Sequence, residues 1–189
     1  MRVAVYGGTN SKEYTKKDMD ESQKLGRFLA TKGVEVVTGA CLGFPYFVGK
    51  EVVQNGGKVI GFSPAKDEAE HIERYKFLLD GCSYIRYMEN PGETQAQNFT
   101  RRGVDLTENS DLVVAIGGSW GTYTELLFSF IYKRPIILIE EFGGAVEAFA
   151  NTWKFFNERD YNPEVHYGSR IIRVKTVDEA IEVLEKEFI

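Results

Sequence analysis

The residues best suited to chemistry form a glycine- and hydroxyl-rich stretch that follows the apolar run Leu112–Ile116. The stretch reads Gly117-Gly118-Ser119-Trp120-Gly121-Thr122-Tyr123-Thr124-Glu125. Glycines between a strand and a helix let the backbone approach a ligand, and the helix start offers unpaired N–H groups and a positive dipole end to an anion. The residues predicted to bind phosphate here are Gly117, Gly118, Ser119, Gly121 and Thr122.

Thr122 and Glu125 have two interpretations. Thr-x-x-Glu at a helix start is the pattern of a capping box, in which the two side chains bond backbone N–H groups of the first turn. In the other interpretation, the Glu125 carboxylate belongs to the ligand site. The glycine cluster and the strand before it favour a functional loop.

Arg102 is the second candidate and lies in the predicted helix Glu93–Asn109. The face of this helix that should pack on the sheet comprises Phe99, Gly103 and Leu106. Arg102 borders this face, whereas Arg101 points the other way and should be solvated. The Arg102 guanidinium either reaches into the crevice as a fixed cation or lies in water above a packed stem.

Two more glycine turns end predicted strands, one after residues 2–6 and one after Val34–Thr38. In a doubly wound parallel sheet these turns share the carboxyl edge with residues 117–125, and ligands bind there beside the point where the strand order reverses. The residues of these turns expected to contact phosphate or nucleotide are Gly7, Gly8, Thr9 and Gly39. The sequence has neither G-x-G-x-x-G in the first turn nor G-x-x-x-x-G-K-[ST], which argues against an ordinary dehydrogenase, a kinase and a P-loop NTPase.

Short β-branched runs alternate with segments of helical period, which predicts a mainly parallel sheet covered by helices on both faces. The expected strands are Arg2–Tyr6, Val34–Thr38, Lys58–Phe62, Leu112–Ile116, Pro135–Ile139 and Ile171–Val174, with Ser83–Tyr87 as a weaker candidate. The expected helices are Lys16–Thr31, Tyr46–Gln54, Glu93–Asn109, Thr122–Tyr132, Ala145–Asn157 and Val177–Phe188. The predicted fold class is therefore α/β, a Rossmann-like three-layer α/β/α arrangement, with residues 1–189 as a single domain. Ser63–Asp80, charged and poorly periodic, should form at most a short helix and a solvated surface.

The composition is that of an acidic globular protein. The chain has 189 residues, 43% of them hydrophobic, and a net charge of −5, which is too apolar for a disordered chain and argues against a protein that grips nucleic-acid backbones. Cys41 and Cys82 are too few and too scattered for a disulfide framework or a zinc site, so a cytoplasmic location is expected. No apolar run approaches the roughly 20 residues of a membrane helix. His71 and His166 lack the spacing of metal ligands, and neither a metal nor a cofactor is expected.

Taken together, these motifs resemble the LOG (LONELY GUY) family, whose members were long mistaken for lysine decarboxylases. The likeness rests on Gly-Gly-x-x-Gly-Thr-x-x-Glu at 117–125, on Arg102, on Val-Ala-Val-Tyr-Gly-Gly at 3–8 and on residues 56–64. The resemblance implies a phosphoribohydrolase that splits a nucleoside 5′-monophosphate into free base and ribose 5-phosphate without metal or cofactor, with Arg102 and Glu125 as the catalytic pair. The longer spacing between Gly-Gly and Gly-Thr resembles a sister branch that includes molybdenum-cofactor carrier proteins.

Three functions follow as hypotheses. The leading one is a nucleoside 5′-monophosphate phosphoribohydrolase, and its alternative is a non-catalytic carrier that binds a nucleotide or a pterin-type molybdenum cofactor in the same crevice. DNA binding is the third, since a bacterial DNA-uptake family shares a related core, but the acidic charge and the lack of a basic stripe argue against it. We therefore expect a small-molecule partner, no nucleic acid and no membrane.

The segment that follows the motif predicts self-association. Residues 126–132 read Leu-Leu-Phe-Ser-Phe-Ile-Tyr, apolar on nearly every side. One face of this helix packs on the sheet, and a helix that is apolar all round must bury its other faces too. A partner subunit is the natural cover, and the LOG resemblance implies pairing through the helices that flank the motif. We therefore expect a homodimer or a tetramer built from dimers.

Overall fold

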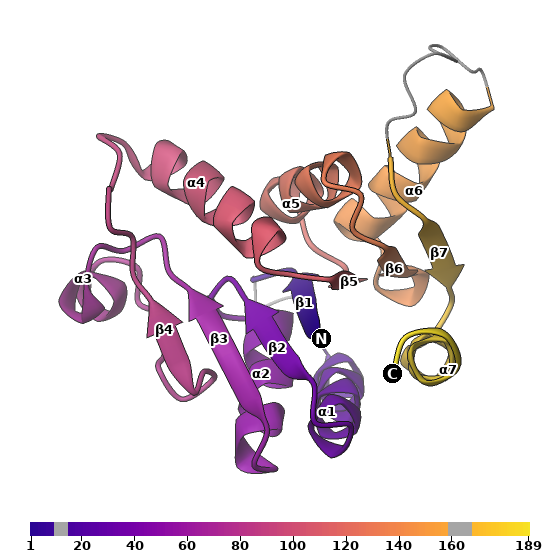
Figure 1. The fold of residues 1–189 in the computed structure, drawn as a ribbon, viewed down its shortest axis with the longest axis horizontal. Helices are drawn as coiled ribbons and strands as arrows, with labels where there is room; N and C mark the ends of the chain where they lie inside the picture. The colour runs from indigo at the N-terminus through magenta and orange to yellow at the C-terminus, as the bar shows by residue number, and fades with distance from the viewer. Residues whose placement is uncertain (10–14, 159–167) are drawn as a thin grey trace.

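The computed structural model describes residues 1–9, 15–158 and 168–189. Within these residues the chain forms a central seven-stranded parallel sheet (Figure 1). The strands are β1 (Arg2–Gly7), β2 (Glu35–Thr38), β3 (Lys58–Phe62), β4 (Tyr84–Arg86), β5 (Leu112–Ile116), β6 (Ile136–Ile139) and β7 (Ile171–Val174). Their order across the sheet is β4-β3-β2-β1-β5-β6-β7. The chain thus builds outward from β1 to β4, returns to the centre at β5 and builds outward on the other side. The strand order reverses between β1 and β5.

Helices cover both faces of the sheet. The described helices are α1 (Lys16–Thr31), α2 (Phe44–Gln54), α3 (Glu68–Glu73), α4 (Gln95–Glu108), α5 (Trp120–Ile131), α6 (Gly144–Asn157) and α7 (Val177–Glu187), with a 3-10 turn at Glu140–Phe142. In Figure 1, α4, α5 and α6 lie along one face, and α1, α2 and α7 lie along the other. The predicted three-layer α/β/α arrangement is confirmed.

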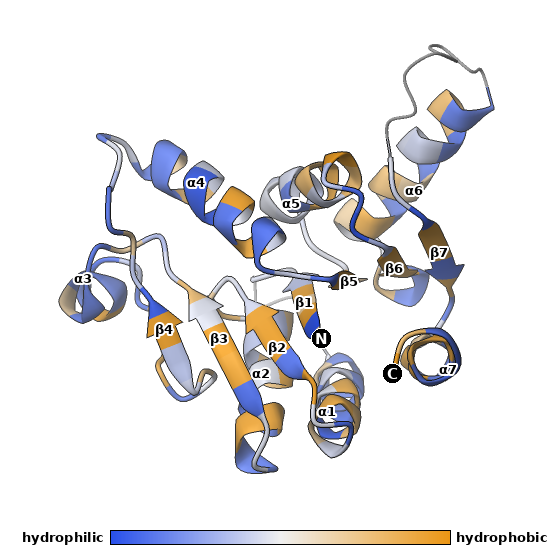
Figure 2. Ribbon diagram, viewed as in Figure 1, coloured by the Kyte–Doolittle hydropathy of each residue, from blue (hydrophilic) through white to orange (hydrophobic). Residues whose placement is uncertain are grey.

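All strands except the short β4 send side chains into both of two separate cores, one on each face of the sheet. In β5, Leu112, Val114 and Ile116 join the core under α1, α2 and α7, whereas Val113 and Ala115 join the core under α4, α5 and α6. All five are fully buried or nearly so. A parallel strand that is buried on both faces needs such a continuous apolar run, and Figure 2 shows β2 and β3 mostly in the hydrophobic colour for the same reason.

Most predicted elements begin and end within two residues of their predicted bounds, and two differences affect the site. The weak candidate strand at 83–87 is the short edge strand β4, and the irregular segment 63–80 contains α3. Helix α5 begins at Trp120 instead of Thr122, so Gly121 and Thr122 lie within its first turn. No described helix combines the length and the apolar character that crossing a membrane requires.

Candidate functional site

The three glycine turns meet at a cavity of about 260 Å³, at the carboxyl edge of the sheet and beside the point where the strand order reverses. The predicted site residues that line it are Gly7, Gly8, Thr9, Gly39, Arg102, Ser119, Gly121, Thr122 and Glu125. These residues come from the ends of β1 and β2, from α4 and from the start of α5. Gly117 and Gly118 are the two predicted residues that do not line the cavity.

Gly117 and Gly118 shape the turn from β5 into α5. Their φ angles are +58° and +96°, in the left-handed region that favours glycine. A Cβ atom on Gly118 would lie 2.3 Å from Thr122 Oγ1, closer than a side chain can be accommodated. The two glycines therefore allow the tight turn that brings Ser119 and Gly121 to the cavity.

The start of α5 carries no capping box. Ser119 is the N-cap residue, and its side chain makes no capping hydrogen bond. Thr122 Oγ1 donates to the carbonyl of Gly7 at 3.1 Å, and the Glu125 carboxylate bonds Arg102. The capping interpretation of Thr122 and Glu125 is therefore wrong. The first N–H groups of α5, which a helix cannot satisfy internally, face the end of β1 without a side-chain cap.

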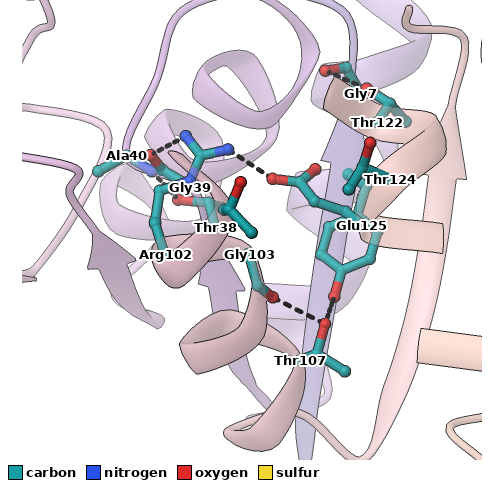
Figure 3. Close-up of polar contacts among 12 residues, drawn as sticks. Gly7, Thr38, Gly39, Ala40, Arg102, Gly103, Thr107, Thr122, Thr124 and Glu125 are labelled. Atoms are coloured by element: carbon teal, nitrogen blue, oxygen red, sulfur yellow. Dashed lines mark hydrogen bonds and ion pairs between the residues drawn. The ribbon is translucent and has the colours of Figure 1, made fainter. Parts of the chain in front are cut away.

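Arg102 and Glu125 form a buried ion pair that joins α4 to α5 (Figure 3). Arg102 Nη2 lies 2.5 Å from Glu125 Oε1, and Arg102 Nη1 donates to the carbonyl of Gly39 at 3.2 Å. Only 7% of Arg102 and 8% of Glu125 are exposed. The guanidinium of Arg102 therefore reaches into the crevice, whereas the neighbouring Arg101 is exposed, as predicted, and donates to the carbonyl of Asn90.

Two neighbours leave room for the Arg102 side chain and hold it. Its guanidinium lies over the ring of Phe99, 5.0 Å from the centroid. Gly39 lies against the guanidinium, because a Cβ atom at Gly39 would be 2.9 Å from Nη1. The buried Arg102 Nε has no hydrogen-bond partner among the residues that the structure describes. A buried donor of this kind needs an acceptor, and an oxygen atom of a bound ligand would supply one.

Burial also sets the proton affinities in the cavity. It raises the pKa of Glu125, while the adjacent Arg102 guanidinium acts in the opposite direction. A carboxylate with a raised pKa is a better proton acceptor near neutral pH, and the arginine beside it keeps its charge. Burial raises the pKa of the Cys41 thiol to about 11, so this lining residue stays protonated and is a poor nucleophile.

Phe77 and Phe99 line the same cavity, and neither is among the predicted site residues. Phe77 comes from the segment 63–80, whose charged side chains are mostly exposed as expected. Its aromatic residues instead point inward, with Tyr75 stacked on Phe77 and edge-on to Phe99, both at a centroid distance of 5.7 Å. The signal in the sequence was two aromatic residues, Tyr75 and Phe77, two positions apart within a charged stretch.

His71 lies in the interior of the protein, beside Ser63. His71 is buried, its Nδ1 lies 2.8 Å from Ser63 Oγ, and burial lowers its pKa. His166 lies outside the described residues. Across residues 1–9, 15–158 and 168–189, no three His, Cys, Asp or Glu side chains come together in a way that could hold a metal ion.

A second cavity, of about 580 Å³, adjoins the first at Arg102. Its charged lining residues are Arg86, Glu89, Arg101, Arg102, Asp105 and Glu108. Phe62, Tyr87 and Met88 add an apolar part. The two cavities together offer an anion-binding helix start, a fixed cation, a carboxylate of raised pKa and aromatic surface, which suits a small phosphorylated ligand with a heterocyclic part.

Solved structures with a similar fold include three proteins of different kinds. The protein designated TM1055 has a TM-score of 0.76 and 26% identity, over 98% of each chain. The molybdenum cofactor carrier protein from Chlamydomonas reinhardtii has a TM-score of 0.68 and 22% identity, over 98% of this chain and 96% of that one. DNA processing protein A from Helicobacter pylori, which binds single-stranded DNA, has a TM-score of 0.65 and 15% identity, over 100% of this chain and 82% of that one. The last two likenesses show the fold alone.

Sequence comparisons define the family. Comparison with curated protein sequences gives no match. The sequence model of the SLOG cluster4 family, however, matches residues 1–181. This range includes all three glycine turns, Arg102 and Glu125. The chain therefore belongs to the SLOG cluster4 family, a member of the LOG-like superfamily.

Proposed function

We propose that this protein is a nucleoside 5′-monophosphate phosphoribohydrolase, which hydrolyses the N-ribosidic bond to give free base and ribose 5-phosphate. The observation that carries the proposal is the buried Arg102–Glu125 ion pair beside the uncapped start of α5. An anion site and a carboxylate with a raised pKa then share one cavity. Cleavage of a phosphorylated riboside needs both.

The 5′-phosphate binds at the start of α5, where free N–H groups and the positive end of the helix dipole favour an anion. Ser119, Gly121 and Thr122 line the cavity at this point, together with Gly8 and Thr9. A Cβ atom at Gly121 would meet no other atom within 4 Å. The fold does not require glycine there, and the missing side chain leaves room for the phosphate.

Glu125 acts at C1′ of the ribose. Cleavage of an N-ribosidic bond passes through an oxocarbenium-like ribose, as glycoside cleavage does. The Glu125 carboxylate stabilises this cation and accepts a proton from water, whose oxygen bonds to C1′ as the C–N bond breaks and the departing base takes up a proton. A guanidinium is too weak an acid to serve as a proton donor in catalysis, so the role of Arg102 is to hydrogen-bond a ribose or base atom.

The base lies against Phe77 and Phe99. Both rings line the cavity on the α4 side, where the Arg102 guanidinium covers one face of Phe99. Aromatic side chains bury planar heterocycles by stacking or edge-on contact and discriminate weakly among them. We therefore infer that this wall accepts any of the common bases and that hydrogen bonds at its rim select among them.

Base release from AMP, GMP, CMP and UMP tests the proposal. We expect equal amounts of free base and ribose 5-phosphate from at least one of them, separated by chromatography. Arg102→Ala should lower kcat/KM by about a hundredfold to a thousandfold, the range seen when one preorganised donor is removed from an active site. Arg27→Ala changes an exposed arginine on α1, at the other face of the sheet and away from both cavities, and should keep the wild-type rate. No base release from any of the four substrates would overturn the proposal.

Carriage of a pterin-type cofactor without turnover is the second candidate function. It is favoured by the cavity of about 580 Å³ at Arg102, which gives the site more room than a nucleoside monophosphate fills. Such a carrier would bind a phosphorylated pterin tightly and release no base from any nucleotide.

A further part of the proposal is that the protein, with its net charge of −5, binds no nucleic acid. Fluorescence anisotropy with a single-stranded oligonucleotide tests this.

We also propose that residues 1–189 act as one domain and pair through α5. The helix is only partly covered within the chain: Leu126 is buried, Phe128 packs on Gly103, and Leu127 and Ile131 are 39% and 55% exposed. The two exposed residues are four positions apart and therefore share one face of the helix. A second copy of the chain would cover this face in an isologous dimer.

A further inference from the structure

A buried cluster of three hydroxyl groups joins the sheet to the two helices that carry the ion pair. Tyr6 Oη on β1 lies 3.2 Å from Thr107 Oγ1 on α4 and 3.1 Å from Ser129 Oγ on α5. All three residues are buried, with at most 1% exposed. Figure 3 shows Thr107 and the bond that leads from it to Gly103.

The number of protons in this cluster determines which hydroxyl group donates in each hydrogen bond. Thr107 Oγ1 donates to the carbonyl of Gly103, and Ser129 Oγ donates to the carbonyl of Glu125, each at 2.9 Å. A hydroxyl has one proton to give, so both oxygens can only accept from Tyr6. Burial, with the nearby charge of Glu125, raises the pKa of Tyr6 to about 12. The Tyr6 hydroxyl therefore stays protonated and shares its proton between α4 and α5.

The two arms of this cluster end on backbone carbonyls next to or within the ion-paired residues. One arm ends on the carbonyl of Gly103, the residue directly after Arg102, and the other ends on the carbonyl of Glu125. The helices lie close together here, because a Cβ atom on Gly103 would lie 3.2 Å from Phe128 Cε2 and 3.6 Å from Glu125 Cγ. Gly103 thus permits the close approach of α4 and α5, and the Tyr6 hydroxyl links them.

We propose that Tyr6 is a positioning residue whose hydroxyl holds α4 and α5 at the separation that keeps Arg102 Nη2 in contact with Glu125 Oε1. The kinetic consequence of this inference rests on the proposed phosphoribohydrolase activity, whereas its geometric consequence does not. Tyr6 also lines the cavity, but its hydroxyl is engaged by Thr107 and Ser129 and therefore acts on the substrate only through the ion pair.

Tyr6→Phe tests the kinetic consequence, with Tyr123→Phe as the matched control. Tyr6→Phe keeps the ring and leaves Thr107 and Ser129 bonded to their carbonyls, so the variant should fold. Tyr123 Oη donates to Thr152 Oγ1 at 2.9 Å and ties the same helix to α6, away from the ion pair. With the best of the four nucleotides, Tyr6→Phe should lower kcat by about tenfold, the equivalent of one hydrogen bond, and leave KM within about twofold. Tyr123→Phe should keep the wild-type kcat.

NMR of the arginine side chains tests the geometric consequence without any turnover. The signals of Arg102 are assigned from the spectrum of Arg102→Lys, and a buried, bonded guanidinium should give slowly exchanging Nη protons. These signals should broaden in Tyr6→Phe and persist in Tyr123→Phe. A wild-type protein that releases no base contradicts the proposed function but leaves this measurement decisive. Unchanged Arg102 signals in Tyr6→Phe, or equal losses in both variants, would overturn the positioning role.

Discussion

Helices α4 and α5 lie side by side on one face of the sheet, yet they begin in opposite ways (Figure 1). Helix α4 starts with a complete capping box: Thr94 Oγ1 accepts from the N–H of Gln97, and the Gln97 side chain accepts from the N–H of Thr94. Helix α5 starts at Ser119, whose side chain makes no such bond. A helix start closed by its own side chains has fewer donors left for a ligand than an uncapped one. The difference supports α5, and not α4, as the proposed anion site.

The outward faces of the two helices differ as well, and Figure 2 shows α4 as the more hydrophilic of the two. Helix α4 exposes charged residues, among them Arg101, Asp105 and Glu108. Helix α5 exposes the apolar side chains of Leu127 and Ile131. An exposed apolar stripe of this kind marks an interaction surface more often than a charged one does. The comparison therefore supports the proposed ligand and dimer contacts at α5, with Arg102 contributed by α4.

The largest expected effect comes from removing one member of the ion pair between these helices. Arg102→Met leaves the Glu125 carboxylate buried without a counter-charge, which should cost about 3–5 kcal/mol of unfolding free energy and lower kcat/KM by about a hundredfold to a thousandfold, as Arg102→Ala should. Urea unfolding and a turnover assay measure the two effects. The double variant Arg102→Met with Glu125→Leu removes both charges, so it should recover most of the stability but none of the activity. If the double variant is as unstable as the sum of the two single variants, the two charges are not coupled.

The titration of Glu125 should appear in the pH dependence of stability. Because burial raises the pKa of Glu125 above its ordinary value of 4.5, the folded state holds a proton that the unfolded state has already released. The stabilisation is fully present below pH 4.5 and is lost as the pH rises through the folded pKa. The difference in unfolding free energy between wild type and Glu125→Gln should therefore fall with rising pH. A difference that rises with pH would mean that Arg102 outweighs burial.

Charged substitutions on the exposed face of α5 should break the proposed dimer, whereas a charged substitution on the exposed face of α4 should not. Leu127→Glu with Ile131→Glu places two carboxylates in the proposed dimer interface, so the mass measured by light scattering should drop from that of a dimer to that of one chain. Thr100→Glu adds a carboxylate to the exposed face of α4 and should leave the mass unchanged. A wild-type mass of one chain at micromolar concentration would show that α5 is not an interface.

The sheet and its ligand-binding edge could be predicted because they depend on local pattern. A strand buried on both faces must be apolar throughout, so the bounds of β5, Leu112–Ile116, follow from the sequence. The glycine turns then indicated the cavity, because the carboxyl ends of parallel strands lie at one edge of the sheet. Arg102 was placed at the border of the buried face by helical spacing alone.

Contacts between distant residues could not be predicted in the same way. Thr122 and Glu125 fit a local capping box, and what decides against it is a carbonyl 115 residues away in sequence, at Gly7, and the guanidinium of Arg102. Phe77 lies in a segment without periodicity, and its place in the cavity depends on contacts with Tyr75 and, through it, Phe99. Tertiary packing determines whether such a side chain contacts a local or a distant partner, and a single sequence does not reveal that packing.

The smallest expected effect separates the two helix starts directly. Thr94→Ala removes a formed N-cap bond and should cost about 0.5–2 kcal/mol of unfolding free energy. Ser119→Ala removes a side chain that forms no cap bond, so the unfolding free energy should hardly change. Binding should show the reverse order: Ser119→Ala should weaken ribose 5-phosphate binding by about tenfold, the equivalent of one hydrogen bond to a charged group, and Thr94→Ala should leave it unchanged. Calorimetric titration and urea unfolding of both variants give the four values. A stability loss in Ser119→Ala equal to that in Thr94→Ala would mean that Ser119 caps α5 in solution, and that the start of this helix is no more open to an anion than that of α4.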